Sequence, residues 1–436
     1  ESGWYISHER SVDYVRAAQW YARYRQHCVP ISQERSRALY IAGIIALGEM
    51  RLADAWADFA GAIRVAERPV DLANALTVLV GLAARLGRTA TVQRASDAFM
   101  ATEDKTMMTL GDRIEQNRLR AAHLNNIGWS LLLLREAGHD AGDPTKFLLP
   151  ALEIVESPGP NFDPRRADNF RINLALAAVQ RGDVGAADPF LQSVDEFRLN
   201  LEELYWFRMV KVRISAVRGD IRGAIRMLRT LDSFAGTRSR VEMRWQVAHL
   251  RGLVLESFGA LHEAITVYQK AERLLDVLAV PSALGQGRDH YIHALQRSAR
   301  HLIGLQVRLG RDRDALCTLR SARARVHRGL LADITTSPGF HARRREAIDD
   351  GLHRCRAELS REVRATCLER LERERRQLRL TLDTTATLGP ENASLCEALP
   401  SPLSGEVFLA YVRLDDGWVG VAADAAGVTV RHLGEV

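Results

Sequence analysis

Lysine is nearly missing from this chain, in which Lys105, Lys146, Lys211 and Lys270 are the only lysines among 60 basic residues. The formal net charge is nevertheless +6, so arginine supplies most of the positive charge. The arginines alternate with aspartate and glutamate, a pattern typical of solvated helix faces. We therefore attribute the arginine excess to coding bias rather than to phosphate binding, and we do not expect a nucleic-acid partner.

Closely spaced cysteines are also missing, which excludes the common zinc-binding arrangements. No CxxC pair occurs, and an odd number of widely separated cysteines predicts free thiols in a reducing cytosol. Cys317 falls at a packing position of a predicted helix, so we expect a buried thiol there rather than a nucleophile. The cysteines are Cys28, Cys317, Cys355, Cys367 and Cys396.

Long apolar segments are missing as well. No apolar run reaches the roughly 18 residues that suggest a membrane-spanning helix, and the N-terminus has no signal-peptide pattern. We therefore expect a cytoplasmic protein without a membrane partner. The chain starts at Glu1 without an initiator methionine, so we expect a piece of a longer protein.

Motifs for nucleotide, metal or covalent chemistry are absent too. None of the lysines follows a glycine, so there is no Walker A loop. His290 and His293 lie three residues apart, able to share a helix face, but no HExxH or second ligand cluster accompanies them. No cysteine has a recognisable catalytic flank. We expect no catalytic residue, no cofactor and no metal site in these residues.

The most regular feature that is present is a turn followed by small and aromatic residues at helical spacing, in residues 258–271. Gly259 can adopt the left-handed geometry that ends a helix. Ala264, Tyr268 and Ala271 then fall on one face of the following helix. Gly252 provides a small residue where the preceding helix would cross that face. The stretch predicts two helices joined by a tight turn.

The same glycine-x4-alanine spacing occurs four times and predicts successive helix pairs. The glycines are 37, 40 and 51 residues apart, and the loop-forming residues 281–287 absorb the longest gap. Ala55, Phe59 and Ala62 repeat the alanine–aromatic–alanine offsets near the N-terminus. The four copies are Gly182 with Ala187, Gly219 with Ala224, Gly259 with Ala264, and Gly310 with Ala315.

Boundaries of the earlier helices follow from breakers and caps. Pro69 predicts the end of one helix, Asp71 the N-cap of the next, and Gly87 the end of that helix. Residues 123–136 predict a further helix pair, in which Asn125 precedes an apolar run.

These glycine turns and alanine contacts resemble the tetratricopeptide repeat (TPR), a helix-turn-helix unit with a period of about 34 residues. The copies in this chain are longer and less regular than that period. The resemblance implies an all-α helical-hairpin solenoid over residues 1–330. First helices of such pairs line a groove that binds extended peptides or proteins.

Composition changes after about Leu331. Arginine and glutamate alternate between residues 343 and 382 with leucines at helical spacing, which predicts a charged helical hairpin within residues 331–398. Three β-branched and aromatic segments then predict a short antiparallel β meander, which is too small to be stable by itself. These segments are Val407–Leu414, Trp418–Ala422 and Val428–Leu433.

The C-terminal part resembles TPR proteins that end in a CHAT domain, a caspase-like α/β module. Residues 322–333 are similar to the last repeat helix of that family, and residues 399–411 are similar to its first CHAT strand. Residues 415–434 continue the resemblance. The catalytic His and Cys of the family lie beyond the first strands. The resemblance therefore implies that residues 399–436 begin an incomplete CHAT-like domain, with the active site in a longer parent protein.

We therefore expect a regulatory scaffold that recognises a protein or peptide and controls an attached cysteine protease. Ligand binding would change the curvature of the solenoid and the docking of the C-terminal domain. A sensor segment of a bacterial transcriptional regulator and a structural adaptor remain alternatives. The polar residues expected to face the groove are Asn125, Arg213, His249, Glu256 and Arg308.

Overall fold

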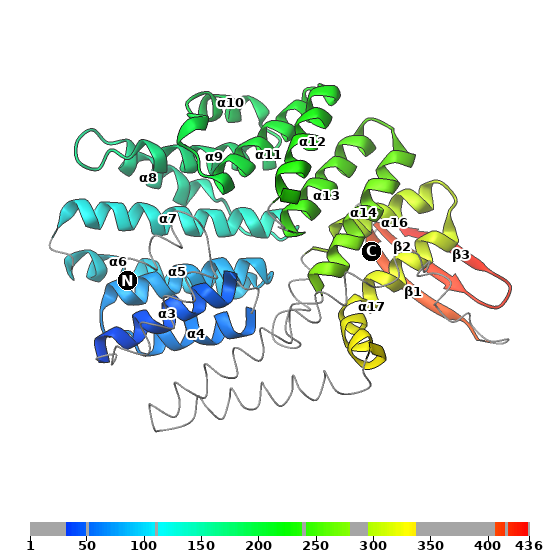
Figure 1. The fold of residues 1–436 in the computed structure, drawn as a ribbon, viewed down its shortest axis with the longest axis horizontal. Coiled ribbons are helices and arrows are strands. Elements are labelled where there is room, and N and C mark those ends of the chain that lie inside the picture. Colours follow the sequence, from blue (N-terminus) through cyan, green and yellow to red (C-terminus); the bar gives the residue numbers. More distant parts are fainter. Residues whose placement is uncertain are drawn as a thin grey trace. The chain divides into compact units, whose positions relative to one another are not determined.

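The computed structural model describes residues 32–48, 52–109, 112–237, 241–279, 295–336, 406–414 and 417–434. This part of the chain is mostly helical and ends in a three-stranded antiparallel sheet (Figure 1). The predicted charged stretch at 343–382, the histidine pair and the loop at 281–287 lie outside these residues. None of the described helices is both long enough and apolar enough to cross a membrane.

The described residues form two compact units, one up to Met227 and one from Leu228 onward. The helices of the first unit are α3 (Ser32–Gly48), α4 (Leu52–Arg64), α5 (Pro69–Arg85), α6 (Thr89–Thr109), α7 (Arg113–Glu136), α8 (Thr145–Glu156), α9 (Pro164–Gln180), α10 (Val184–Gln192), the 3-10 helix η2 (Glu196–Arg198), α11 (Leu201–Val217) and the start of α12 (Ile221–Thr237).

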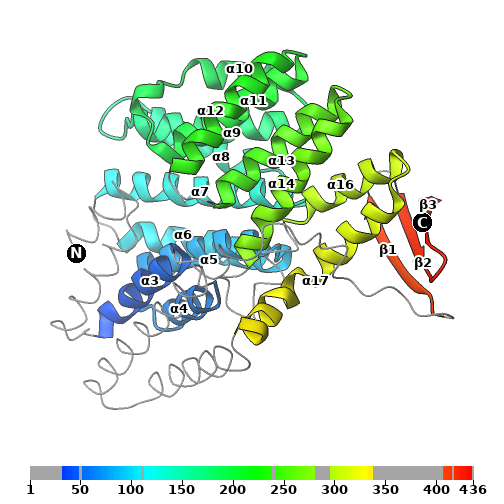
Figure 2. The same cartoon turned by 45° about the vertical axis from the view of Figure 1, so that its right-hand side comes forward.

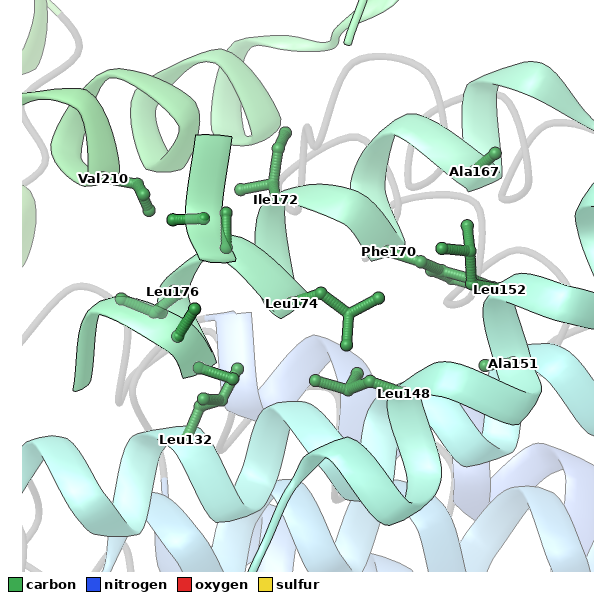
Figure 3. Close-up of a cluster of buried hydrophobic side chains, with 14 of the residues drawn as sticks. Leu132, Leu148, Ala151, Leu152, Ala167, Phe170, Ile172, Leu174, Leu176 and Val210 are labelled. Atoms are coloured by element: carbon green, nitrogen blue, oxygen red, sulfur yellow. The ribbon is translucent and has the colours of Figure 1, made fainter. Parts of the chain in front are cut away.

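Consecutive helices of the first unit pack in pairs: α3 with α4, α5 with α6, α7 with α8, and α9 with α10. The first helices of these pairs also contact one another in turn, since α7 lies against both α5 and α9, and α9 contacts α11. Figure 3 shows the apolar cluster at these contacts, with Leu132 of α7, Leu148 of α8, Leu174 of α9 and Val210 of α11. Burial of these apolar side chains is the main favourable contribution to the free energy of packing the helices together.

Polar residues fix where these helices begin. The Asp163 carboxylate accepts a hydrogen bond from the Arg166 amide at 3.1 Å and caps α9. Asn200 and Glu203 form a capping box at α11, in which each side chain accepts from the other residue's backbone amide. These caps satisfy amides that have no partner inside the helix.

Helix α4 ends at Arg64, so no helix continues through Pro69, but the predicted N-cap and one predicted helix pair are wrong. Pro69 is the first residue of α5 and Arg68 is its N-cap, because proline suits the first turn, where an amide hydrogen is not needed. Asp71 therefore lies inside the first turn, where its carboxylate pairs with Arg68 at 2.7 Å. Residues 123–136 do not form a helix pair, since they belong to one helix, α7, whose partner is α8.

The predicted glycine turns are confirmed. Gly259 has a φ of 82°, in the left-handed region that disfavours side chains, and its amide bonds to the Glu256 carbonyl oxygen at 3.0 Å. Gly182, Gly219 and Gly310 share this conformation. The alanines five residues after these glycines are 0% exposed, as the spacing predicts: Ala187, Ala224, Ala264 and Ala315.

The second unit contains the rest of α12, then α13 (Val241–Ser257), α14 (Leu261–Ala279), α16 (Arg297–Arg308), α17 (Asp312–Thr336), β1 (Phe408–Leu414), β2 (Gly417–Ala423) and β3 (Val428–Gly434). Helix α13 pairs with α14, and α16 pairs with α17. Tyr268 of α14 packs directly on Gly252 of α13, where a Cβ atom would lie 2.3 Å from the tyrosine ring. Gly43 of α3 and Phe59 of α4 repeat this contact in the first unit. Gly252 is thus the crossing residue that the sequence predicts.

The three predicted strands are confirmed and form a meander in the order β1-β2-β3. One face of the sheet packs on α16 and α17 (Figure 2). Val419 and Val421 of β2 are buried there with Ile303, Leu316 and other apolar residues of the two helices. The helices therefore supply the apolar support that a meander of this size needs.

Cys317 on α17 is disulfide-bonded, so the expectation of a free thiol is wrong at this position. The other four cysteines, and with them the partner in this bond, lie outside the described residues. Cys317 is also only half-buried, so the expected buried packing position is not observed there.

We expect Gly252→Ala to lower the free energy of unfolding by about 1–3 kcal/mol, because the added methyl group would overlap the Tyr268 ring. Gly304→Ala on α16 is the matched control. The added Cβ would lie 3.7 Å from Leu414, which is an ordinary contact. This variant should therefore have a free energy of unfolding about 0.5–1 kcal/mol higher, because alanine favours a helix more than glycine does. Urea unfolding of both variants measures the difference. Equal unfolding midpoints would show that the crossing tolerates a side chain.

Candidate functional site

The polar residues of the first helices form a series of contacts from one helix to the next. In the first unit, Asn125 of α7 accepts a hydrogen bond from the Asn173 amide of α9 at 2.8 Å. The Asn125 amide in turn donates to Asn169 at 3.4 Å. Asn125 is buried, so both contacts lie within the protein rather than at its surface. The predicted groove residue Asn125 thus joins α7 to α9.

A second contact in this unit involves three helices. Arg213 of α11 pairs with both carboxylate oxygens of Glu136 on α7, and Gln180 of α9 donates to the same carboxylate at 2.9 Å. Burial would lower the pKa of Arg213, but the Glu136 charge outweighs it and raises that pKa. Arg213 therefore stays protonated and holds α11 to α7 across α9.

The third polar contact of the first unit lies at His123 of α7. Its Nε2 lies 2.9 Å from the Asn74 side-chain oxygen of α5, and its ring meets Phe99 of α6 edge to face. Nδ1 is buried and has no hydrogen-bond partner among the described residues. Burial lowers the pKa of His123 to about 4, so the ring is neutral at pH 7. Nε2 then donates to Asn74.

In the second unit, the Glu256 carboxylate near the end of α13 collects three donors. It accepts from the Tyr268 hydroxyl of α14 at 3.0 Å, lies 3.2 Å from His301 Nδ1 of α16, and pairs with Arg308 of α16. Burial would raise the pKa of Glu256, but His301, Tyr268 and Arg308 together lower it. The carboxylate is therefore ionised and ties three helices together.

The His249 ring lies next to the Tyr268 and His301 rings that contact Glu256. It stacks on Trp245 with an interplanar angle of 3° and a centroid distance of 5.5 Å. The Tyr268 and His301 rings lie 5.9 and 5.6 Å from it. Three of the five predicted residues, His249, Glu256 and Arg308, are thus brought together in one cluster. We call Trp245, His249, Glu256, Tyr268, His301 and Arg308 the α13–α16 cluster.

A buried ion network lies beside this cluster. The Trp245 indole nitrogen donates to Ser298 at 3.1 Å, and Ser298 donates to Glu272 of α14. Arg325 of α17, only 2% exposed, pairs with Glu272 and with Asp276 at 2.8 Å. Burial raises the pKa of Glu272, even though Arg325 favours its charged form. This network fixes α17 to α14.

The sequence did not point to His301, Glu136 or Asn173, each of which contacts a predicted residue, or to Gln180, which contacts Glu136. One signal could have found His301 and Asn173, since contacts between two successive first helices share an offset. Glu256 and His249 each meet a residue 52 positions later. Asn125 and Leu132 each meet one 48 positions later. Once one contacting pair is known, the same offset therefore identifies the next pair between the same two helices.

The chemistry of these contacts is that of hydrogen-bonded and ion-paired groups between helices. Among the described residues, no group of three or more His, Cys, Asp and Glu side chains is placed to hold a metal ion. Asn125 and Arg213 lie in the first unit and do not join the α13–α16 cluster. No family model and no curated protein matches this sequence.

We expect the stability of the protein to fall between pH 6.5 and pH 4 because of His123. Folding lowers its pKa to about 4, so its contribution is complete above the unfolded pKa of 6.5 and is lost as the pH falls toward 4. The loss should reach about 3 kcal/mol. In His123→Gln, which keeps an amide donor for Asn74, this part of the pH dependence should disappear. Urea unfolding at pH 7, 5.5 and 4.5 measures the difference between the two proteins, and parallel curves would contradict the assignment.

We expect Glu256→Gln to lower the free energy of unfolding by about 2 kcal/mol, because three donors lose a charged acceptor. Glu263→Gln, at an exposed position on α14, is the matched control and should change it by about 0.5 kcal/mol or less. Thermal and urea unfolding test both variants. An equal effect of the two substitutions would mean that the α13–α16 cluster adds little to stability.

Proposed function

We propose that this chain is a TPR-like scaffold that recognises a protein or an extended peptide. The observation that carries the proposal is the series of first helices that contact one another and are joined by polar side chains. Helices α5, α7, α9 and α11 carry these contacts within the first unit, and α13 and α16 carry them within the second. Within each unit, such a row offers hydrogen-bonding groups to an extended chain.

Partly exposed members of the row are the groups that a ligand would reach. Arg308 is 48% exposed, so part of its side chain remains accessible to solvent beside Glu256. Arg213 and Glu136 are about one-fifth and one-quarter exposed. A ligand with acidic and amide groups would share these partners, because an arginine has five N–H donors. Asn125 and His249, which are buried, would instead position their neighbours.

Helix α17 would couple recognition to the C-terminal strands. Its Arg325 is anchored to α14, while its Leu316 and Leu319 pack under the sheet. A ligand that shifts α13 or α14 would therefore act on the base of the sheet through one helix. We propose that the strands begin a CHAT-like domain, and that the scaffold controls the cysteine protease active site of a longer parent protein.

We expect neutralisation of the exposed ion pairs on first helices to weaken ligand binding at least tenfold. The variant combines Arg213→Gln and Glu136→Gln with Glu256→Gln and Arg308→Gln, so that amides replace the charges at similar size. The full chain is immobilised, ligands from a bacterial lysate are identified by mass spectrometry, and the affinity of each is measured by calorimetry. Circular dichroism confirms that the variant is folded.

The matched control neutralises an ion pair between second helices, Lys270 of α14 and Asp232 of α12, whose charged atoms lie 2.6 Å apart. Lys270→Gln with Asp232→Asn should leave the affinity unchanged. An equal loss in both variants, or no loss in either, would contradict a binding face on the first helices. A parent reading frame that encodes a helix-turn-helix or Walker motif after these strands would favour a transcriptional regulator instead.

A further inference from the structure

The face of the C-terminal sheet that points away from α16 and α17 is apolar. Leu409 and Tyr411 of β1 are 60% and 51% exposed, Trp418 of β2 is 36% exposed, and Leu433 of β3 is 49% exposed. Exposed large apolar side chains that gather on one face of a small sheet mark an interaction site. The inner face is already covered by α16 and α17, whereas these side chains on the outer face remain exposed.

Gly420 forms the floor of this surface. It lies opposite Tyr411 on β1 and Arg431 on β3, in one row across the three strands. A Cβ at Gly420 would lie 3.4 Å from the Tyr411 ring and 3.3 Å from Leu433, so these two side chains approach each other over the glycine. The apolar residues therefore form a continuous patch rather than scattered side chains.

Two arginines share this face. Arg413 of β1 is paired in register with Trp418, and Arg431 lies opposite Gly420. Both are exposed, and neither forms an ion pair with a described residue. The strands place no aspartate or glutamate on this face. A partner that covers the patch without supplying carboxylates would bury uncompensated positive charge, which is unfavourable.

The dimensions of the face suit one helix. Three strands about 4.8 Å apart span about 10–15 Å, and seven residues extend about 23 Å. A helix with its side chains is about 10–12 Å wide, and about four turns cover that length. We propose that this face, formed by Leu409, Tyr411, Trp418, Gly420 and Leu433 with Arg413 and Arg431, docks an acidic amphipathic helix of a partner protein.

An anionic membrane fits this surface less well. Arg431 lies in the same row as Tyr411 and Gly420, on the edge strand β3 of the patch. Insertion of the apolar side chains into lipid would carry its guanidinium toward the hydrocarbon, which is costly. A helix can instead place a carboxylate beside it, as a bidentate arginine–carboxylate pair.

The probe is a synthetic 18-residue helix with leucine at positions i, i+3, i+4 and i+7 and glutamate on its flanks. A second peptide carries lysine in place of each glutamate. Binding to the full chain is measured by fluorescence anisotropy. We expect the acidic peptide to bind at least tenfold more tightly than the basic one. The double variant Leu409→Ser, Tyr411→Ser should reduce that affinity at least tenfold, and Arg413→Glu with Arg431→Glu should reverse the preference.

Two control variants separate this face from general effects of charge and hydrophobicity. Phe162→Ser with Phe197→Ser removes two exposed apolar side chains of the first unit, and Arg94→Glu with Arg165→Glu makes the same change in net charge there. Neither should alter the affinity for the acidic peptide. Loss of binding in the controls, or retention in the sheet variants, would overturn the proposal.

Other occupants give different results that also overturn it. A second copy of the chain would produce a dimer in size-exclusion chromatography with light scattering, abolished by Tyr411→Ser. A lipid surface would produce binding to phosphatidylserine vesicles without binding of the acidic peptide. If the control variants still bind the acidic peptide and the sheet variants do not, the result supports docking of an acidic amphipathic helix on this face. This outcome is independent of the groove, because none of the residues changed contacts the α13–α16 cluster.

Discussion

The contact between Tyr268 and Gly252 is the constraint on which much of the second unit depends. The ring lies where a side chain at position 252 would be, so α13 and α14 can approach only because that side chain is missing. The hydroxyl of the same tyrosine reaches Glu256, one turn further along α13. One residue thus joins apolar packing to the polar contacts, and Glu256 in turn orients His301 and Arg308 of α16. A shift of the ring would disturb the packing and the carboxylate's hydrogen bonds together.

Polar side chains between helices largely determine the register in which the helices pack. Apolar contacts alone would allow α7, α9 and α11 to slide by a turn with little loss, but the Glu136 carboxylate meets Gln180 and Arg213 in one register only. The same argument holds for Arg325, whose guanidinium is buried between Glu272 and Asp276. Buried ion pairs contribute little net stability, because desolvation offsets the attraction. Breaking one partner is nevertheless costly, so these groups exclude alternative packings.

The parts of the fold that follow from local spacing could be predicted from the sequence, and the parts that depend on distant pairs could not. Gly259 and Ala264 lie within one turn and the next helix, so their roles follow from backbone geometry alone. The strands follow from their β-branched and aromatic residues, and all three are confirmed. The partners of Glu256 lie 45 and 52 residues away, and helical spacing within one element gives no information at that range. Proline can both stop a preceding helix and open the next one, so Pro69 begins α5 and the N-cap is Arg68 rather than Asp71.

Helix α17 connects the two kinds of contact in the second unit. Its buried arginine fixes it to α14, while Arg320 lies over the Phe408 ring at 5.0 Å and Arg323 donates to the Tyr411 carbonyl oxygen of β1. The sheet is therefore held by apolar contacts on one face and by a helix arginine at its first strand. Since a three-stranded meander has little stability of its own, its order depends on the position of α17. A movement of α14 must either break its buried ion pairs with Arg325 or carry α17 along, and in the second case the sheet moves with α17 as one body.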